Sequence, residues 1–189
     1  MFELVRKADE DYRTLQEKKE KLKQKIEEYR AKQQIVAPFR PLECDLHRVL
    51  HYRYITYRFG RIAVEFYHKM QKYLMDDLKA IFVEGERDES YVYGVYFVSQ
   101  AETQKVDAVF RSLHFERIEL KDEFEGTPDT AYRVLENEIA RVNLEIEDLD
   151  KQAGEMLADR APQLVAARDR LEELSNNFDV RKLAARMED

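Results

Sequence analysis

The sequence predicts an α+β protein in which a compact βαββαβ lobe is inserted between two long antiparallel coiled-coil helices. Charged residues make up 38% of the chain, and only five glycines and four prolines punctuate it, which favours long solvated helices over many short strands. Apolar residues recur at heptad spacing toward both ends of the chain. Between these two regions lies the most strand-like run, YVYGVYFVS at 91–99, whose Tyr, Val and Phe residues suit a pleated, half-buried surface.

The first coiled-coil helix is predicted over residues 1–37. Lys19 and Gln33 are the polar interruptions of its a/d heptad. The apolar members are Val5, Ala8, Tyr12, Leu15, Leu22, Ile26, Tyr29 and Val36. Pro38 and Pro41 should end this helix, because proline cannot continue one. A short helical turn at 43–50 is then expected to dock onto the lobe.

The lobe is predicted over residues 38–125. Alternating apolar residues indicate strands at 53–62, 80–85, 91–99 and 115–120, and helical periodicity indicates helices at 64–78 and 102–113. This order is the ferredoxin-like split unit. Right-handed crossovers would place both helices on one face of a four-stranded antiparallel sheet, with the first and third strands in its centre.

The second coiled-coil helix is predicted over residues 126–189. Thr127 suits the N-cap position and Pro128 the first helical position. Its heptad alternates steps of three and four without a fault, through Tyr132, Leu135, Ile139, Val142, Ile146, Leu149, Ala153 and Met156. A kink is expected near 154–162, because Pro162 removes one helical hydrogen bond.

Composition and charge restrict the functional class. The net charge of -7 argues against a nucleic-acid partner, which needs a basic face. The strand at 91–99 weakly resembles the aromatic strand of an RRM, but Tyr93 stands where a basic residue should precede the glycine. No run approaches the roughly 18 apolar residues of a membrane span, and no secretory signal is evident. The single cysteine, Cys44, fits a reducing cytosol.

No catalytic, cofactor or metal site is predicted. Cys44, His47 and His51 have the spacing C-x2-H-x3-H and would share one helical face, as metal ligands sometimes do. With no obvious fourth ligand, we interpret them instead as surface and half-buried polar residues. The sequence contains no phosphate-binding glycine loop, no G-x-S-x-G and no H-E-x-x-H, so a non-catalytic protein is expected.

The candidate partner-binding residues belong to the aromatic surface of the lobe. We expect this surface opposite the predicted helices, since aromatic residues and arginine are typical of interface centres. Its members are Tyr54, Arg58, Tyr91, Tyr93 and Phe97. The alternative is that the long helices or residues 38–50 cover this face.

Several runs, taken in order, resemble subunit I of V-type ATP synthases, the prokaryotic relative of subunit a of the vacuolar proton pump. They are YRFGRI at 57–62, YGVYFV at 93–98, LHFERI at 113–118, GTP at 126–128 and NFDVRKLAAR at 177–186. Ala63 departs from the proline that the family often has after Gly-x-Ile. The resemblance implies the cytoplasmic half of that subunit, namely its distal lobe with part of its coiled coil.

That resemblance implies a stator on the cytoplasmic side of the membrane. The distal lobe would bind the peripheral stalk, a heterodimer of subunits E and G, and the coil would transmit load to the membrane half of the same subunit. The alternative from another class is a small-molecule regulatory module of the ACT type on coiled-coil arms, since ACT domains share the βαββαβ order.

The two long helices differ in length and in charge. Residues 1–36 contain ten basic and eight acidic side chains, a net of +2, whereas residues 128–189 contain nine and fifteen, a net of -6. At 1.5 Å per residue the helices would measure roughly 50 and 90 Å. The apolar stripe Leu164, Ala167, Leu171, Leu174 and Phe178 therefore lacks a partner in the first helix. This stripe would be covered either by folding back of the chain or by a second molecule, and we favour self-association.

Overall fold

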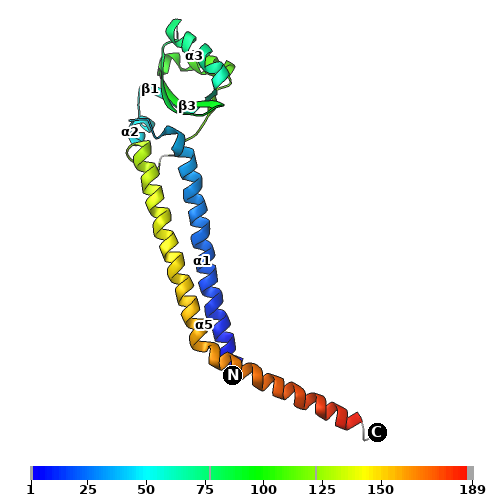
Figure 1. Cartoon of the computed structure of the whole chain (residues 1–189). Coiled ribbons are helices and arrows are strands. Elements are labelled where there is room, and N and C mark those ends of the chain that lie inside the picture. Colours follow the sequence, from blue (N-terminus) through cyan, green and yellow to red (C-terminus); the bar gives the residue numbers. More distant parts are fainter. Residues whose placement is uncertain (1, 77, 122, 187–189) are drawn as a thin grey trace. The chain divides into compact units, whose positions relative to one another are not determined.

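The computed structural model describes residues 2–76, 78–121 and 123–186 of the chain. It divides into two compact units, one made of Met1–Lys25 with Arg141–Asp189 and the other of Ile26–Ala140. Two helices, α1 (Phe2–Val36) and α5 (Pro128–Arg186), each contribute to both units. The predicted α+β fold, with its lobe flanked by helices, is confirmed (Figure 1). None of the described helices is long and apolar enough to cross a membrane.

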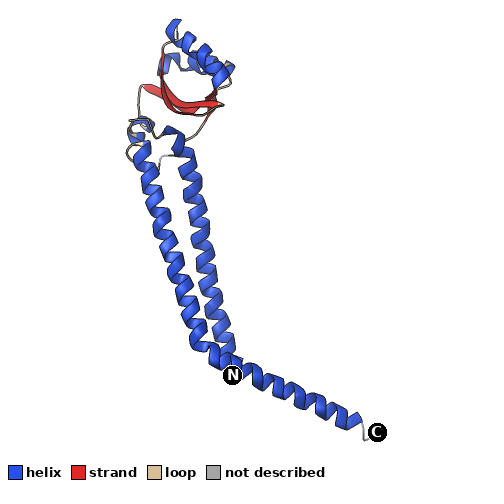
Figure 2. Ribbon diagram, in the orientation of Figure 1, coloured by secondary structure: helices blue, strands red, loops and turns tan. Residues whose placement is uncertain are grey.

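The lobe in the second unit is a four-stranded antiparallel sheet of order β2-β3-β1-β4. Its strands, red in Figure 2, are β1 (Ile55–Ala63), β2 (Ala80–Arg87), β3 (Tyr91–Ser99) and β4 (Glu116–Arg117). The first and third strands are central, as predicted, and pair over their full length from Ile55↔Ser99 to Ala63↔Tyr91. The fourth strand is shorter than the predicted 115–120, because only Gly60 and Arg61 of β1 pair with it.

Helices α3 (Val64–Asp76) and α4 (Thr103–Ser112) cover one face of this sheet, as the crossover rule predicted. Between them and the sheet lies a core of fully buried side chains from both layers, including Ile62, Met70, Tyr96 and Phe110. The rings of Tyr96 and Phe110 stack with centroids 3.9 Å apart. This face is therefore closed by the lobe's own helices.

The opposite face, which we call the outer face, is covered in part by the segment that follows α1. A 3-10 turn η1 (Ala37–Phe39) and helix α2 (Leu46–Leu50) lie there, on the other side of the sheet from α3 (Figure 1). Helix α2 is shorter than the predicted 43–50, because Asp45 caps it by accepting a hydrogen bond from the Arg48 backbone N–H at 2.9 Å. Buried side chains of η1, α2 and the outer face of the sheet form a second hydrophobic core. This core also includes residues at the C-terminal end of α1 and the N-terminal end of α5.

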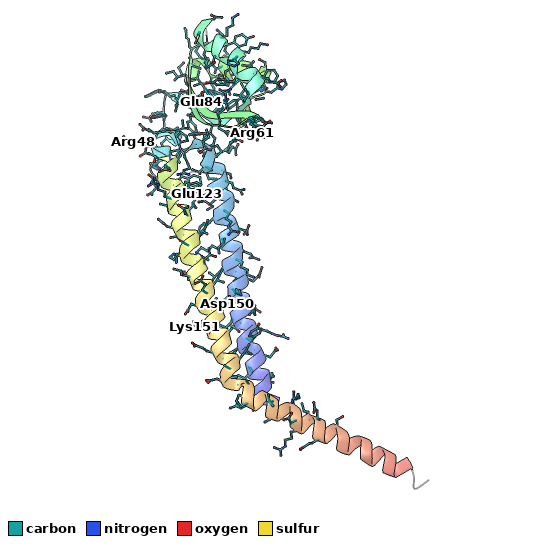
Figure 3. The ribbon with its side chains drawn as sticks, in the orientation of Figure 1. Arg48, Arg61, Glu84, Glu123, Asp150 and Lys151 are labelled. Atoms are coloured by element: carbon teal, nitrogen blue, oxygen red, sulfur yellow. The ribbon has the colours of Figure 1, made fainter. Side chains whose placement is uncertain are left out.

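The α1 and α5 helices pack antiparallel within each unit, as the two heptads predicted. In the first unit Ala8, Val142 and Ala153 are buried, and Lys19 Nζ lies 2.5 Å from a carboxylate oxygen of Asp150, which projects from α5 toward α1 (Figure 3). In the second unit Ile26 and Leu135 are buried. The polar heptad member Lys19 is therefore accommodated by a cross-helix ion pair.

The second long helix begins where the sequence predicted it. Thr127 Oγ1 accepts a hydrogen bond from the Thr130 backbone N–H at 3.2 Å, and Gly126 before it has a φ of +74°, which favours glycine. The helix continues through Pro162 to Arg186. In the predicted stripe, Leu171 is exposed, and the side chains of Leu164, Ala167, Leu174 and Phe178 lie outside the described set. The kink and the covering of the stripe stay predictions.

Candidate partner-binding surface

The cover over the outer face is anchored by Phe39 of η1. Its side chain is fully buried, and its ring meets those of Phe59 and Tyr93 edge-on, with centroids 5.2 and 6.4 Å away. The Pro38 carbonyl oxygen lies so near Gly85 of β2 that a Cβ on that glycine would approach it to 2.6 Å. This close approach of two backbones holds η1 over the middle of the sheet, so the central outer face is core and not a free surface.

The structure brings together only some of the five residues predicted to bind a partner: the rings of Tyr91 and Tyr93 lie 6.5 Å apart on the outer face. Tyr93 and Phe97 are half-buried and pack against the core under η1. Tyr91 is half-buried beneath the Arg61 guanidinium, whose carbon lies 4.1 Å from the ring centroid. Tyr54 precedes β1 and is 74% exposed. Of this set, Tyr54 is the aromatic side chain most open to a partner.

Arg58 lies on the other face of the sheet. It pairs in register with the buried Tyr96, and its guanidinium reaches Asp107 of α4 at 3.5 Å. Asp107 also accepts hydrogen bonds from the Tyr96 hydroxyl at 2.7 Å and from Arg117 at 2.6 Å. Burial, followed by the hydrogen bond to Asp107, raises the pKa of Tyr96. Arg58 therefore fastens α4 to the sheet and is separated from the outer-face aromatics.

An exposed apolar surface does remain on the outer face, along the edge strand β2. Ile81 and Val83 are 67% and 40% exposed, and the pairing register places them beside Phe97 and Val95 of β3. Ile55, 44% exposed, lies on the same face of β1. We call Ile55, Ile81, Val83 and Phe97 the edge patch. Sequence reasoning missed Ile81 and Val83, although alternation along 80–85 was the signal that pointed their side chains outward.

The acidic run that follows the edge patch is tied into the lobe. Glu84 accepts a hydrogen bond from the Tyr67 hydroxyl at 2.5 Å, and burial together with this bond raises the pKa of Tyr67 to about 12. Asp88 accepts backbone hydrogen bonds from Tyr91 and Ser90, both at 2.7 Å, which lower its pKa. In the acidic run made of Glu84, Glu86, Asp88 and Glu89, Glu84 thus ties β2 to α3, and Asp88 organises the turn between β2 and β3.

Cys44, His47 and His51, which share the spacing of possible metal ligands, lie on α2 and the segment that precedes it. The His51 ring nitrogen Nδ1 lies 2.8 Å from the His47 carbonyl oxygen, and the two rings are 4.3 Å apart. Cys44 is half-buried, and burial raises the pKa of its thiol, which disfavours the thiolate that metals bind. Within the described residues, no group of three or more His, Cys, Asp and Glu side chains is arranged to hold a metal ion.

Comparison with known proteins gives a likeness to a solved structure. No protein-family model and no curated protein matches the chain. A solved structure, titled "Crystal structure of the cytoplasmic N-terminal domain of subunit I, homolog of subunit a, of V-ATPase", superposes with a TM-score of 0.51 at 12% sequence identity. The match covers 82% of this chain and 51% of that one, so the chain spans about half the length of that structure. At this identity the likeness shows the fold.

Proposed function

We propose that this chain is a stator element of a rotary V-type ATPase or ATP synthase, the distal part of the cytoplasmic N-terminal domain of a subunit I. The observation that carries the proposal is the shared architecture, in which a βαββαβ lobe stands between two long antiparallel helices over 82% of the chain. The sequence runs that resemble the same subunit support it. The proposed role is mechanical and non-catalytic, on the cytoplasmic side of the membrane.

The helices supply what a strut needs. A coiled coil resists bending because each apolar residue of one helix is enclosed by residues of the other. In this chain Ala8, Val142 and Ala153 are buried in one unit, while Ile26 and Leu135 are buried in the other. Ion pairs add cross-links, such as that between Asp11 and Arg160 at 2.9 Å. In the intact subunit this coil would transmit load to the membrane half.

The lobe supplies the partner contact in this proposal. The peripheral stalk heterodimer of subunits E and G would bind the edge patch together with Tyr54. Exposed apolar residues at a sheet edge are both an interaction surface and an aggregation hazard, and a bound partner removes the hazard. The half-buried Phe97 is the aromatic member of the patch, and Ile81, the most exposed member, lies next to it on β2.

The test is a titration of the full chain with the purified E/G heterodimer by calorimetry. Ile81→Asp should weaken binding by more than about 1 kcal/mol, the usual threshold for an interface residue that matters. Met75→Asp is the matched control, because Met75 is an 84% exposed apolar residue on α3, away from the outer face. Circular dichroism should show both variants folded, since both side chains are exposed.

Two results would count against the proposal. Wild-type chain that does not bind the heterodimer would remove the stator assignment. If small molecules, and not the heterodimer, changed the melting temperature of the chain, the ACT-type alternative would be favoured. Binding that Met75→Asp disrupts and Ile81→Asp leaves intact would keep the stator role but move the contact to the helical face.

A further inference from the structure

An open groove runs along one side of the coiled coil in the first unit. It has a volume of about 690 Å³ and is lined by Lys18, Lys21, Leu22, Arg141, Leu144, Glu145, Asp148 and Leu149. The α5 wall includes residues 141, 144, 145 and 148, the i, i+3, i+4, i+7 spacing of one helical face. The groove therefore follows the two helices, and an additional helix lying along them would contact both walls.

The floor of the groove is apolar. Leu22 and Leu149 are half-buried members of the two heptads, whereas Leu144 lies outside the α5 heptad and is 65% exposed. Leu144 is therefore not one of the a/d residues that form the seam between α1 and α5. Together the three leucines form the kind of hole into which the apolar residues of an additional helix insert.

The charges on the two lips differ. On the α5 lip, Arg141 is paired with Glu145 at 2.8 Å, and Asp148 accepts a hydrogen bond from Gln152 at 2.7 Å. On the α1 lip, Lys18 and Lys21 are exposed, and neither makes an ion pair or hydrogen bond within the described residues. The α5 lip therefore keeps one negative charge, that of Asp148, because Arg141 and Glu145 neutralise each other, whereas the α1 lip carries two unpaired positive charges three residues apart.

We propose that this groove binds an amphipathic helix of a partner protein, with acidic residues along the flank that meets Lys18 and Lys21. Its apolar stripe would cover Leu22, Leu144 and Leu149, and its carboxylates would pair with the lysines and set its orientation. An anionic membrane is disfavoured, because Glu145 and Asp148 line the same groove and would repel negatively charged headgroups. This inference rests on the coil alone and is independent of the proposed stator role.

Two synthetic helical peptides test the proposal with the full-length chain. Both carry leucine at every a and d position; one has glutamate on the flank and the other has lysine. Fluorescence anisotropy should show the acidic peptide binding roughly tenfold or more tightly than the basic one. The double variant Lys18→Glu/Lys21→Glu should reverse this preference, a gain for the basic peptide that loss of folding cannot mimic.

A matched pair of leucine variants locates the binding site. Leu144→Gln should weaken binding of the acidic peptide, while Leu157→Gln, at a 44% exposed position of the same helix outside the groove, should not. Equal binding of the two peptides would overturn the proposal, as would a larger effect at Leu157. It would also be overturned if the chain alone dimerised and Leu144→Gln abolished dimerisation, since the occupant would then be a second copy.

Discussion

Replacing Phe39 by alanine should destabilise the lobe more than any exposed aromatic substitution. The Phe39 side chain is fully buried, and truncating a buried phenylalanine costs about 3–5 kcal/mol. In this variant Phe59 and Tyr93 each lose an edge-to-face partner. Such pairs contribute about 0.5–1.5 kcal/mol beyond the buried area, so the expected loss lies in the upper half of the range of about 3–5 kcal/mol. The free energy of unfolding should fall by about 4 kcal/mol.

Urea unfolding followed by tyrosine fluorescence and circular dichroism measures this loss, since the chain has no tryptophan. With a slope of about 2 kcal/mol per molar urea, the midpoint should fall by about 2 M. Tyr54→Ala, at a 74% exposed position, is the control and should change stability by less than about 0.5 kcal/mol. A loss below about 1 kcal/mol for Phe39→Ala would refute the conclusion that η1 covers the central part of the outer face.

Three further predictions concern charge and backbone packing. The pKa of Tyr67 is raised from 10.0 to about 12 in the folded protein. The stability that this shift contributes is therefore complete below pH 10.0 and is lost as the pH rises toward about 12. Unfolding of Tyr67→Phe at alkaline pH should lack this loss. The hydrogen bond from Arg40 lowers the pKa of Asp129. The stability that Asp129 contributes is therefore present above its ordinary pKa of 3.8 and should disappear as the pH falls through the lowered pKa. Asp129→Asn should make stability depend less on pH in the acid range. Gly60→Ala should detach β4, since the added Cβ would collide with the Glu116 carbonyl oxygen; unchanged amide exchange in β4 would contradict this.

Local patterns account for most of the secondary structure. The heptads predicted both long helices, and Ala8, Ile26, Val36, Leu135, Val142 and Ala153 are buried as their a/d positions require. Strand β3 has the predicted ends. These features are readable from sequence because helical and strand periodicity are set by residues within a few positions of one another. The strand order followed as well, since crossover handedness leaves few arrangements.

Long-range packing decided which surfaces are free, and with them the candidate site. Sequence alternation left open whether the outer face was covered, because the cover, Phe39, comes from a segment that precedes the lobe and has no periodicity of its own. Arg58 was grouped with the outer aromatics, yet its register with Tyr96 and its pairing with Asp107 place it on the helix face.

The sequence by itself therefore determined the helices and strands, which depend on neighbouring residues, and their order, which the handedness of the crossovers restricts. Only the tertiary structure decided that Ile81 and Val83 remain exposed, that β4 stops after two residues, and that a groove with an uncompensated basic lip opens beside Leu144. The physical reason is that burial and charge compensation depend on which side chains distant in sequence come within contact distance, and no local period encodes that distance.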